Sequence, residues 1–447
     1  MKRIFVSVLS AAFSVSAFAL GPRIDPASVK LEQKFGAKAA TIEYVLENSP
    51  GIVTVDIETN AVANAAKDDP GWVSIGGENI QGLEGDVNKL VEETGRRTIT
   101  WNLFEGWPGQ KVPKGSARAV VTAWATNAPP DYLVVDLAQD NHIRYYTSTN
   151  FLPYGGLTNV YYKRDAIVMR KIPAQAVEWK MGSAAGSTFH YGNEPQHDVI
   201  LTNDFYIGVF MLTRGQVVKF ASYDWNTKDP YCMIDGQKAW QYGKIRCDGG
   251  GDPTNAAPCC TTNWKFMRGE AADGYDWPAN RHKVNPERWL GRARAKTGVD
   301  FDLPTEAQWE FACRAGTSTD TYNGDFKKTN DDIEKVVKPI AWFDGSLGGM
   351  QWSPVGEKIP NAFGLYDMIG NGCELCLDYY AADYGGVAKK YEPEGPASGS
   401  ARTYRSCSGA LSYLYATSAK RDNQNRTYYG TRLVCPIMLK YAEQEKE

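Results

Sequence analysis

The segment 360–380, P-N-A-F-G-L-Y-D-M-I-G-N-G-C-E-L-C-L-D-Y-Y, constrains the fold most strongly, because three glycines interrupt its apolar residues. Glycine lets the backbone turn tightly, so this segment predicts a glycine-rich loop rather than a helix. The carboxylates of Asp367 and Glu374 and the backbone carbonyls of Gly370 and Gly372 can then face one point. Such hard oxygens suit Ca²⁺, which binds about six to eight of them. The alternative is a buried turn whose carboxylates accept hydrogen bonds from neighbouring amides.

The N-terminus has the pattern of a secretory signal peptide over residues 1–19. Lys2 and Arg3 precede an apolar run over residues 4–18, and residues 17–19 (A-F-A) fit the small-x-small cleavage pattern. The run is too short to span a bilayer, and later windows do not hold about 18 apolar residues without charge. We therefore expect no transmembrane segment after cleavage, and a protein that is secreted, periplasmic or at the cell surface.

The charge balance argues against nucleic acid as a partner. The 49 basic and 52 acidic residues give a formal charge of −3, and no basic stripe runs along the chain. Aromatic residues make up 12% of the sequence, with 13 Trp and 25 Tyr. These rings either fill a core or form a surface that binds carbohydrate or peptide.

The cysteines are distributed unevenly. All nine lie in the C-terminal half: Cys232, Cys247, Cys259, Cys260, Cys313, Cys373, Cys376, Cys407 and Cys435. An exported protein folds in an oxidising compartment, so most of them should form disulfides. The odd number leaves at least one thiol free, ligated or paired between molecules. The asymmetry also indicates a boundary between an N-terminal and a C-terminal part.

The sequence of the N-terminal part predicts β-strands. Residues 51–59 and 97–103 alternate apolar and polar side chains, and residues 117–124 follow a Pro-Lys-Gly turn. Strands at this spacing predict a small β-sandwich, immunoglobulin-like, over residues 20–128. The prolines of the segment 126–130 (T-N-A-P-P) then break the chain.

Beyond this break, short helices and strands alternate with irregular segments. Residues 132–137 and 166–170 are predicted strands. Capping boxes at residues 213–216 and 305–308 predict helices that begin after Thr213 and Thr305. A third helix is predicted from Asn285 to about Gly298.

Read in order, the motifs of residues 131–440 resemble the formylglycine-generating enzyme (sulfatase-modifying factor) family. The similar segments are 172–183, 205–220, 303–316, 354–375, 405–408 and 430–434. The resemblance implies a variant C-type-lectin-like fold. We therefore expect an α+β chain: the all-β sandwich, a formylglycine-generating-enzyme-like domain over residues 129–440, and a tail over 441–447.

The chemistry implied by the resemblance is not matched by the residues. Family enzymes oxidise a cysteine in a Cys-x-Pro-x-Arg segment of a sulfatase, with O₂ and with Cu(I) held by two cysteines. The corresponding positions hold Leu411 and Ala416. Soft Cu(I) needs thiolates, so we expect neither bound copper nor formylglycine-generating activity.

The residues match the structural metal site of the family better than its copper site. Its calcium ligands correspond to Asp367, Gly370, Gly372 and Glu374, which strengthens the prediction of a structural Ca²⁺. By the same analogy, Cys313 and Cys435 form a disulfide that ties a helix to the C-terminal strand.

Three further cysteines leave alternatives open. Cys373 and Cys376 form a C-x-x-C motif, and the family packs the segment of Cys407 beside that loop. A disulfide between Cys373 and Cys407 is one interpretation. A soft-metal or redox site of all three thiols is another, and unpaired packing is the third.

The segment 409–429 corresponds to the substrate-facing floor of the family. It is rich in Tyr, Ser and Asn, which serve adaptable binding surfaces well. The candidate ligand-binding residues are Tyr413, Tyr415, Arg421, Asn423 and Asn425. The alternative is a solvated loop between two strands.

These observations favour an exported, non-catalytic binding or scaffold module with a protein or glycan ligand. The alternative is a copper- and O₂-dependent oxidase, of the formylglycine-generating type or a diverged metal or redox enzyme, that uses Cys373, Cys376 and Cys407.

Overall fold

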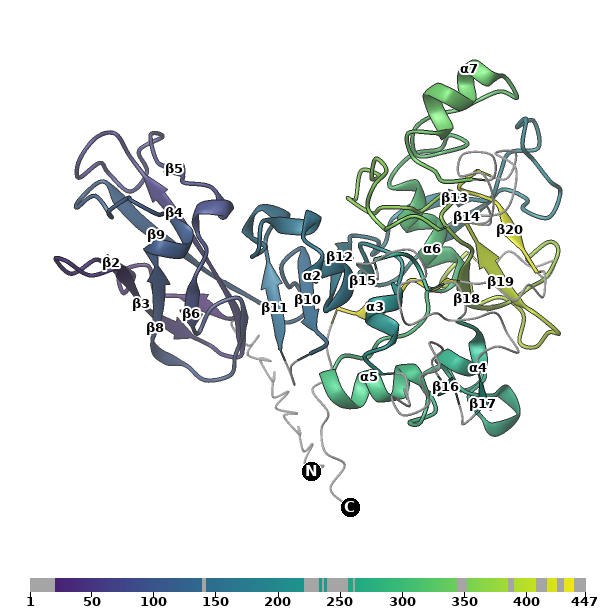
Figure 1. Ribbon diagram of the computed structural model, residues 1–447, viewed down its shortest axis with the longest axis horizontal. Helices are drawn as coiled ribbons and strands as arrows, with labels where there is room; N and C mark the ends of the chain where they lie inside the picture. The colour runs from purple at the N-terminus through teal and green to yellow at the C-terminus, as the bar shows by residue number, and fades with distance from the viewer. Residues whose placement is uncertain are drawn as a thin grey trace, which may run out of the picture.

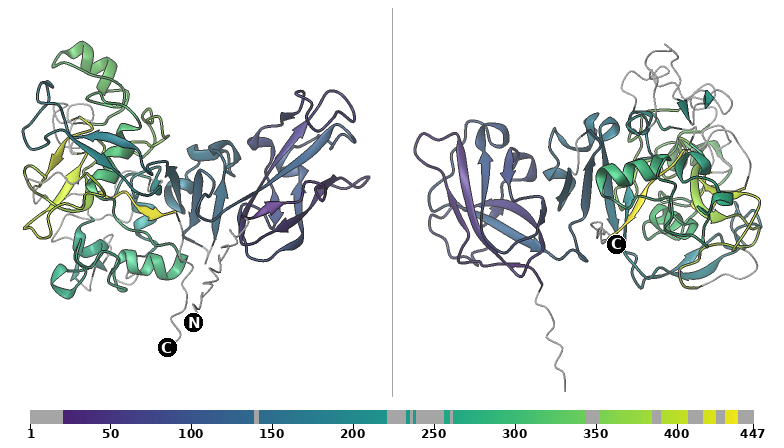
Figure 2. Two further views of the ribbon diagram at one scale, coloured as in Figure 1. Left: turned by 180° about the vertical axis from the view of Figure 1, so that it is seen from behind. Right: turned by 90° about the horizontal axis from the view of Figure 1, so that it is seen from below.

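The computed structural model describes most of the chain, in several stretches. These are residues 21–138, 142–220, 233–234, 237–238, 256–259, 262–343, 352–384, 390–406, 416–423 and 430–437. The N-terminal β-sandwich lies at one end, and the sheet that contains β10, β11 and β12 lies between it and the rest of the C-terminal domain (Figures 1 and 2).

Two antiparallel sheets build the sandwich. The first has the order β1-β3-β8-β6, with β2 paired to β3, and the second joins β4 to β5, β7 and β9. The strands are β1 (Arg23–Ile24), β2 (Lys30–Glu32), β3 (Ala39–Glu47), β4 (Gly51–Thr59), β5 (Val73–Ser74), β6 (Leu83–Gly85), β7 (Lys89–Val91), β8 (Gly95–Asn102) and β9 (Ala117–Trp124). The short helix α1 (Leu103–Gly106) follows β8.

The strand order matches part of an immunoglobulin-like sandwich, without a described strand in the place of G. The path β1-β3-β8-β6 corresponds to strands A-B-E-D, and β9-β4 corresponds to F-C. Alternate residues of β3 are buried, among them Ile42 and Tyr44, and these pack with Trp101 of β8 in one apolar core. The predicted strand 117–124 coincides with β9, and 51–59 coincides with β4.

The sandwich contacts the C-terminal domain directly. The backbone N–H of Tyr145 donates to the carbonyl of Asn88 at 2.8 Å, and Ile52 belongs to an apolar cluster of the C-terminal domain. Gly77 lies so close to residues 150–151 that a Cβ would come within 2.7 Å of their backbone. Glycine is therefore required at this contact.

The C-terminal domain has a central antiparallel sheet of order β11-β10-β12-β15-β21. Its strands are β10 (Tyr132–Asp136), β11 (Ile143–Tyr146), β12 (Ala166–Ile172), β15 (Phe205–Gly208) and β21 (Val434–Pro436). The last of these comes from the C-terminal end of the chain and pairs with β15. The two ends of the domain are thereby joined.

Smaller elements surround this sheet. The strands are β13 (Glu178–Met181), β14 (His197–Ile200), β16 (Met233–Ile234), β17 (Gln237–Lys238), β18 (Glu374–Tyr379), β19 (Arg402–Arg405) and β20 (Arg421–Asp422). The helices are α2 (Tyr161–Arg164), α3 (Arg214–Val217), α4 (Trp264–Met267), α5 (Trp289–Thr297), α6 (Glu306–Arg314) and α7 (Asn330–Asp332). The mixture confirms the predicted α+β class.

The predicted helix starts are confirmed at two places and wrong at one. Both capping boxes are formed, with the Thr213 and Thr305 hydroxyls accepting from the amides of residues 216 and 308. The third helix begins at Trp289 instead of Asn285. Residues 285–288 form a turn in which the Arg288 amide donates to the Asn285 carbonyl at 3.0 Å.

Candidate functional site

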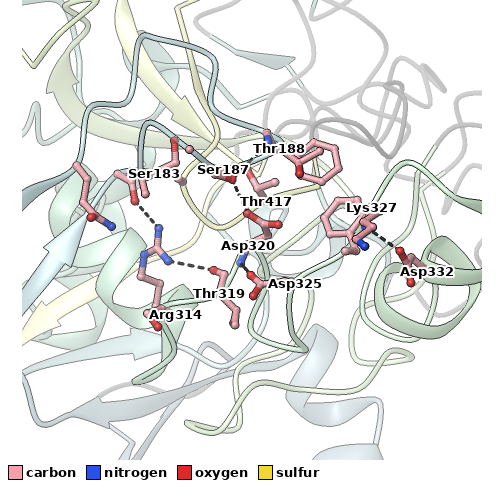
Figure 3. A pocket seen from close by; sticks show the side chains of 18 residues that line it. Ser183, Ser187, Thr188, Arg314, Thr319, Asp320, Asp325, Lys327, Asp332 and Thr417 are labelled. Atoms are coloured by element: carbon pink, nitrogen blue, oxygen red, sulfur yellow. Dashed lines mark hydrogen bonds between the residues drawn. The ribbon is translucent and has the colours of Figure 1, made fainter.

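A polar cavity of about 430 Å³ lies beside the segment in which the family is expected to bind its substrate. Its walls are the loop after β13, the segment after α6, and residues 417–419 (Figure 3). This volume is within the range of small-molecule sites. Among the residues that the structure describes, it is far larger than the pockets near Asp378 and Ile167, of about 30 and 10 Å³.

The first wall is a closed loop. The Ser183 amide donates to the Glu194 carbonyl at 2.9 Å, so the two ends of the loop lie side by side. Gly182 has a φ of +87°, and a Cβ there would lie 2.6 Å from the carbonyl oxygen of Glu194. Glycine alone fits this backbone, and it sets the Ser183 side chain at the cavity.

Arg314, at the end of α6, ties the two walls together. Its Nη2 donates to the carbonyl of Gly182 at 2.8 Å, and its Nη1 donates to the carbonyl of Thr319 at 3.2 Å. Its Nε pairs with the buried carboxylate of Glu310 at 2.8 Å. The guanidinium is thus held by the protein, and it serves to position the walls.

The second wall carries aspartates whose oxygens are partly engaged. The Ser187 hydroxyl donates to Oδ1 of Asp320 at 2.8 Å, and the Asp320 amide donates to Oδ1 of Asp325 at 2.8 Å (Figure 3). Burial raises the pKa of Asp320, and the nearby Asp325 raises it further. At the rim, Asp332 accepts from the Lys327 amide at 2.9 Å. The cavity therefore presents carboxylate and hydroxyl oxygens that can accept hydrogen bonds.

Thr417 is the least satisfied residue of this lining. Its side chain is 3% exposed, it lines the cavity, and its Oγ1 has no hydrogen-bond partner. The next residue is fixed, because the Ser418 amide donates to the Asp320 carbonyl at 2.8 Å. An unsatisfied buried hydroxyl costs roughly 1–3 kcal/mol. A polar ligand in the cavity would remove this cost.

Behind the cavity, buried ion pairs fix α6 to β19 and β20. Arg405 pairs with Glu306 at 2.9 Å and also with Glu310. Arg421 donates from Nε and Nη2 to the two oxygens of Glu306, at 2.6 and 2.8 Å. Arg421 was expected to bind ligand at the surface. It is instead 1% exposed and serves this internal network.

The other candidate ligand-binding residues provide less information about a binding surface. Asn423 is exposed, and its backbone N–H donates to the carboxylate of Asp422 at 2.7 Å. Tyr413, Tyr415 and Asn425 lie outside the described residues, so they stay predictions.

The structure brings the proposed calcium ligands into one region but does not leave them free. Both oxygens of Glu374 accept from Arg432, the closest contact being 2.9 Å, and Oε2 also accepts from the Trp309 indole at 2.7 Å. The Gly370 carbonyl accepts from the Ser406 hydroxyl at 3.2 Å. The described residues contain no group of three or more acidic, His or Cys side chains placed to hold a metal ion.

Asp367 is the acidic member of this set with an available oxygen. It is fully buried, its Oδ2 accepts from the Gly356 amide at 2.8 Å, and its Oδ1 has no partner. Burial raises its pKa to about 6. Because the Arg432 guanidinium already neutralises Glu374, the set does not fit a calcium ion in this arrangement, and Gly372 adds only a backbone carbonyl.

The two thiols of the C-x-x-C motif do not share one site. Cys373 is buried with Leu375 and Leu377 in one apolar cluster, whereas Cys376 lies in another. Residues on a strand alternate between its two faces, so the two thiols of the C-x-x-C motif point apart. Cys373 and Cys376 are free among the described residues, and the Cys373–Cys407 disulfide stays a prediction. Cys407 itself lies outside the described residues.

The disulfide expected by analogy between Cys313 and Cys435 is absent. Both thiols are free and belong to different apolar clusters. Cys435 contacts the sulfur of Met169 at 3.7 Å, and Cys313 contacts the carbonyl of Met368 at 3.8 Å. Burial raises the pKa of Cys313 to about 12, so this thiol stays protonated.

Sequence reasoning missed the cavity. Its walls come from three segments that are far apart in the chain, and their residues carry no recognised catalytic spacing. One available signal was the polar run 317–325, T-S-T-D-T-Y-N-G-D, directly after the predicted helix.

Comparison with known proteins identifies the family. Residues 170–435, more than half of the 447 residues, match the family described as sulfatase-modifying factor enzyme 1-like domain, FGE-sulfatase. The chain belongs to this family.

The chain is also similar to several curated proteins. The chain is 31% identical over 172 residues to the formylglycine-generating enzyme of Thermomonospora curvata, which covers 36% of this chain and 56% of that protein. It is 25% identical over 250 residues to the serine/threonine-protein kinase pkn1 of Chlamydia pneumoniae, and the match covers 54% of this chain and 33% of that protein. The chain thus spans between a third and about half of these relatives.

Solved structures of similar shape include PvdO from Pseudomonas aeruginosa, with 21% identity and a TM-score of 0.44, covering 60% of this chain and 94% of that one. Treponema denticola variable protein 1 has 22% identity and a TM-score of 0.42, and the match covers 61% of this chain and 95% of that one. In the part of this chain that the structure describes, no helix is long and apolar enough to cross a bilayer.

Proposed function

We propose that this protein is a non-catalytic binding module of the sulfatase-modifying factor family, and that a protein or glycan ligand binds in the cavity beside residues 417–419. The observation that carries the proposal is Thr417, whose buried hydroxyl lines the cavity without a hydrogen-bond partner. Signal-directed export to the periplasm, the cell surface or the medium is part of the same proposal.

The character of the cavity supports a ligand that donates hydrogen bonds. Asp320, Asp325 and Asp332 line it, and of the two cations in its wall Arg314 is already engaged by Glu310. Hydroxyl groups of a sugar, or amides and basic side chains of a protein, would satisfy the remaining carboxylate and hydroxyl oxygens.

The copper of the family does not fit the residues that the structure describes here. Ala416, at the position expected for the second thiolate, is fully buried in an apolar cluster. A methyl group provides no ligand for a soft cation. Cys376 belongs to the same cluster, and burial raises its pKa well above the usual value, so it too is a protonated thiol.

The substitution Thr417→Val tests the cavity, because it keeps the shape of the side chain and removes the unsatisfied hydroxyl. Screening the full chain against a glycan array and a displayed peptide library would supply the ligand. We expect Thr417→Val to weaken binding by about tenfold, and to leave the free energy of unfolding unchanged or higher. Asp320→Asn should weaken binding similarly.

Asp273→Asn is the matched control, because Asp273 is an exposed carboxylate outside the cavity. It should leave binding unchanged. Ligand binding that survives both Thr417→Val and Asp320→Asn would overturn the assignment, as would the absence of any ligand in both screens.

A further inference from the structure

The outer end of the N-terminal sandwich exposes two phenylalanines. Phe35 is fully exposed and lies in the turn before β3, and Phe104 is 75% exposed and lies in α1, directly after β8. Both are at the same end of the sheet, where Ala39 of β3 pairs with Asn102 of β8. In Figure 1 the turn between β2 and β3 projects at the far left, on the side away from the C-terminal domain. An exposed phenyl ring of this kind is unfavourable in water unless it has a partner.

The loops that carry the two rings are held together. The Leu103 amide donates to the Lys38 carbonyl at 3.1 Å, and the Val112 amide donates to Oε1 of Gln33 at 3.0 Å. Turn 33–38 and the segment 103–112 therefore form one surface. We call it the Phe tip, defined by Lys34, Phe35, Lys38, Phe104 and Lys111.

The rings project from a rigid base. The Phe35 turn is closed by the Ala37 amide, which donates to the Lys34 carbonyl at 3.0 Å, with Gly36 at a φ of +77°. Phe104 stands on α1, and the following Trp107 stacks on the buried Trp101 at 5.9 Å between ring centroids. Neither ring is needed to fill the core of the sandwich.

In the segments that carry the rings, three exposed lysines outnumber two exposed glutamates, Glu32 and Glu105. Lys34, Lys38 and Lys111 are exposed, and none of them forms an ion pair with a residue that the structure describes. The nearest acidic side chain of α1, Glu105, accepts from the Asn102 amide group at 2.6 Å. The Phe tip thus combines apolar rings with unpaired ammonium groups.

This combination distinguishes between two kinds of partner. Protein interfaces are enriched in aromatic residues, phenylalanine included, but they are depleted in lysine. Membrane surfaces accommodate both kinds of residue, with apolar rings in the headgroup boundary and lysines against anionic lipid. Lysine stems also allow the ammonium groups to reach the headgroups beside the inserted rings.

We propose that the Phe tip docks on an anionic lipid surface, with Phe35 and Phe104 inserted at the headgroup boundary and the lysines paired with lipid phosphates. The cavity of the C-terminal domain lies in the other domain, so the two proposals are independent.

Vesicle co-sedimentation of the full chain tests the proposal. We expect binding to phosphatidylcholine vesicles that contain phosphatidylglycerol, weaker binding to pure phosphatidylcholine, and loss of the difference at about 1 M salt. Phe35→Ser and Phe104→Ser should each weaken vesicle binding by about tenfold or more. Their melting temperatures should stay unchanged, because both rings lie in solvent.

Tyr391→Ser is the control, since Tyr391 is 62% exposed and lies in the C-terminal domain. It should bind vesicles like the parent protein. Equal binding by the Phe variants, or no binding to either vesicle, would overturn the proposal. Retention of a protein on the Phe tip without vesicle binding would assign the surface to a protein partner instead.

Discussion

At the scale of single residues, the most informative contact joins Glu374 to Arg432. Both side chains are fully buried, and Arg432 also donates to the carbonyls of Gly208, Val209 and Tyr366. One guanidinium therefore links the glycine-rich loop, β15 and β18. It supplies the positive charge that the sequence led us to expect from calcium.

Glu374→Gln should destabilise the fold by roughly 3–5 kcal/mol, because it leaves Arg432 buried without its counter-charge. Calcium chelation should leave the melting temperature of the parent protein unchanged. Chemical unfolding and thermal melting with and without chelator measure the two effects.

Glu178→Gln is the control, because Glu178 pairs with Lys390 at the surface and should contribute only about 0–1 kcal/mol. If chelation lowers the melting temperature of the parent protein and Glu374→Gln abolishes this response, calcium is the ligand of Glu374 and our account of this site is wrong.

At the scale of elements, helix α6 organises the C-terminal domain. Its N-terminal amide at Glu306 donates to Oδ2 of Asp378, in β18, at 2.7 Å. Burial raises the pKa of Asp378 to about 7, and the negative charge of Glu306 adds to this, while Arg421 opposes it. The folded state therefore holds a proton on Asp378 more tightly than the unfolded chain does.

The sign of the pH dependence follows from this difference. A carboxyl group whose pKa is raised by folding binds its proton more tightly in the folded state than in the unfolded chain. The free energy of unfolding therefore falls as the pH rises from about 4, where Asp378 ionises in the unfolded chain, to about 7, where it ionises in the folded state. Asp378→Asn removes the charge and keeps an acceptor for the Glu306 amide. It should raise the free energy of unfolding by roughly 2–4 kcal/mol at about pH 8, with little effect at about pH 4.

Urea unfolding of the parent protein and of Asp378→Asn at both pH values is the measurement. Titrating groups that do not interact with Asp378 contribute equally to the two proteins and cancel in the difference. A difference between the two proteins that is independent of pH would show that Asp378 does not titrate as described.

Elements with strong local signals were predictable from the sequence. Alternation of apolar residues located β4 and β9, and the capping boxes located the starts of α3 and α6. The start of α5 was placed too early, because the Asn-Pro pair that often opens a helix here forms a turn. The Asn-Pro pair alone does not show whether it opens a helix or forms a turn.

Pairings between distant segments were not predictable in the same way. The spacing of Cys373 and Cys376 suggested one site, but the strand places the thiols in different apolar clusters. The cavity depends on residues from the loop after β13, the segment after α6 and residues 417–419, which only the fold brings together. Sequence reasoning therefore did not identify the side chains that line the cavity.

At the scale of the whole molecule, an immunoglobulin-like sandwich precedes a domain of the sulfatase-modifying factor family. In our proposal the C-terminal domain uses a polar cavity to bind a ligand. The sandwich supplies a second contact surface through the Phe tip. Both surfaces act by binding, and neither requires a redox metal.

Oxygen consumption tests this central claim most directly. The full chain, supplied with copper and with a Cys-x-Pro-x-Arg peptide, would be compared with an active formylglycine-generating enzyme. We predict no peptide-dependent oxygen uptake and no conversion of the peptide cysteine. Peptide-dependent uptake that Cys407→Ser or Cys376→Ser abolishes would contradict the account and establish the protein as an oxidase.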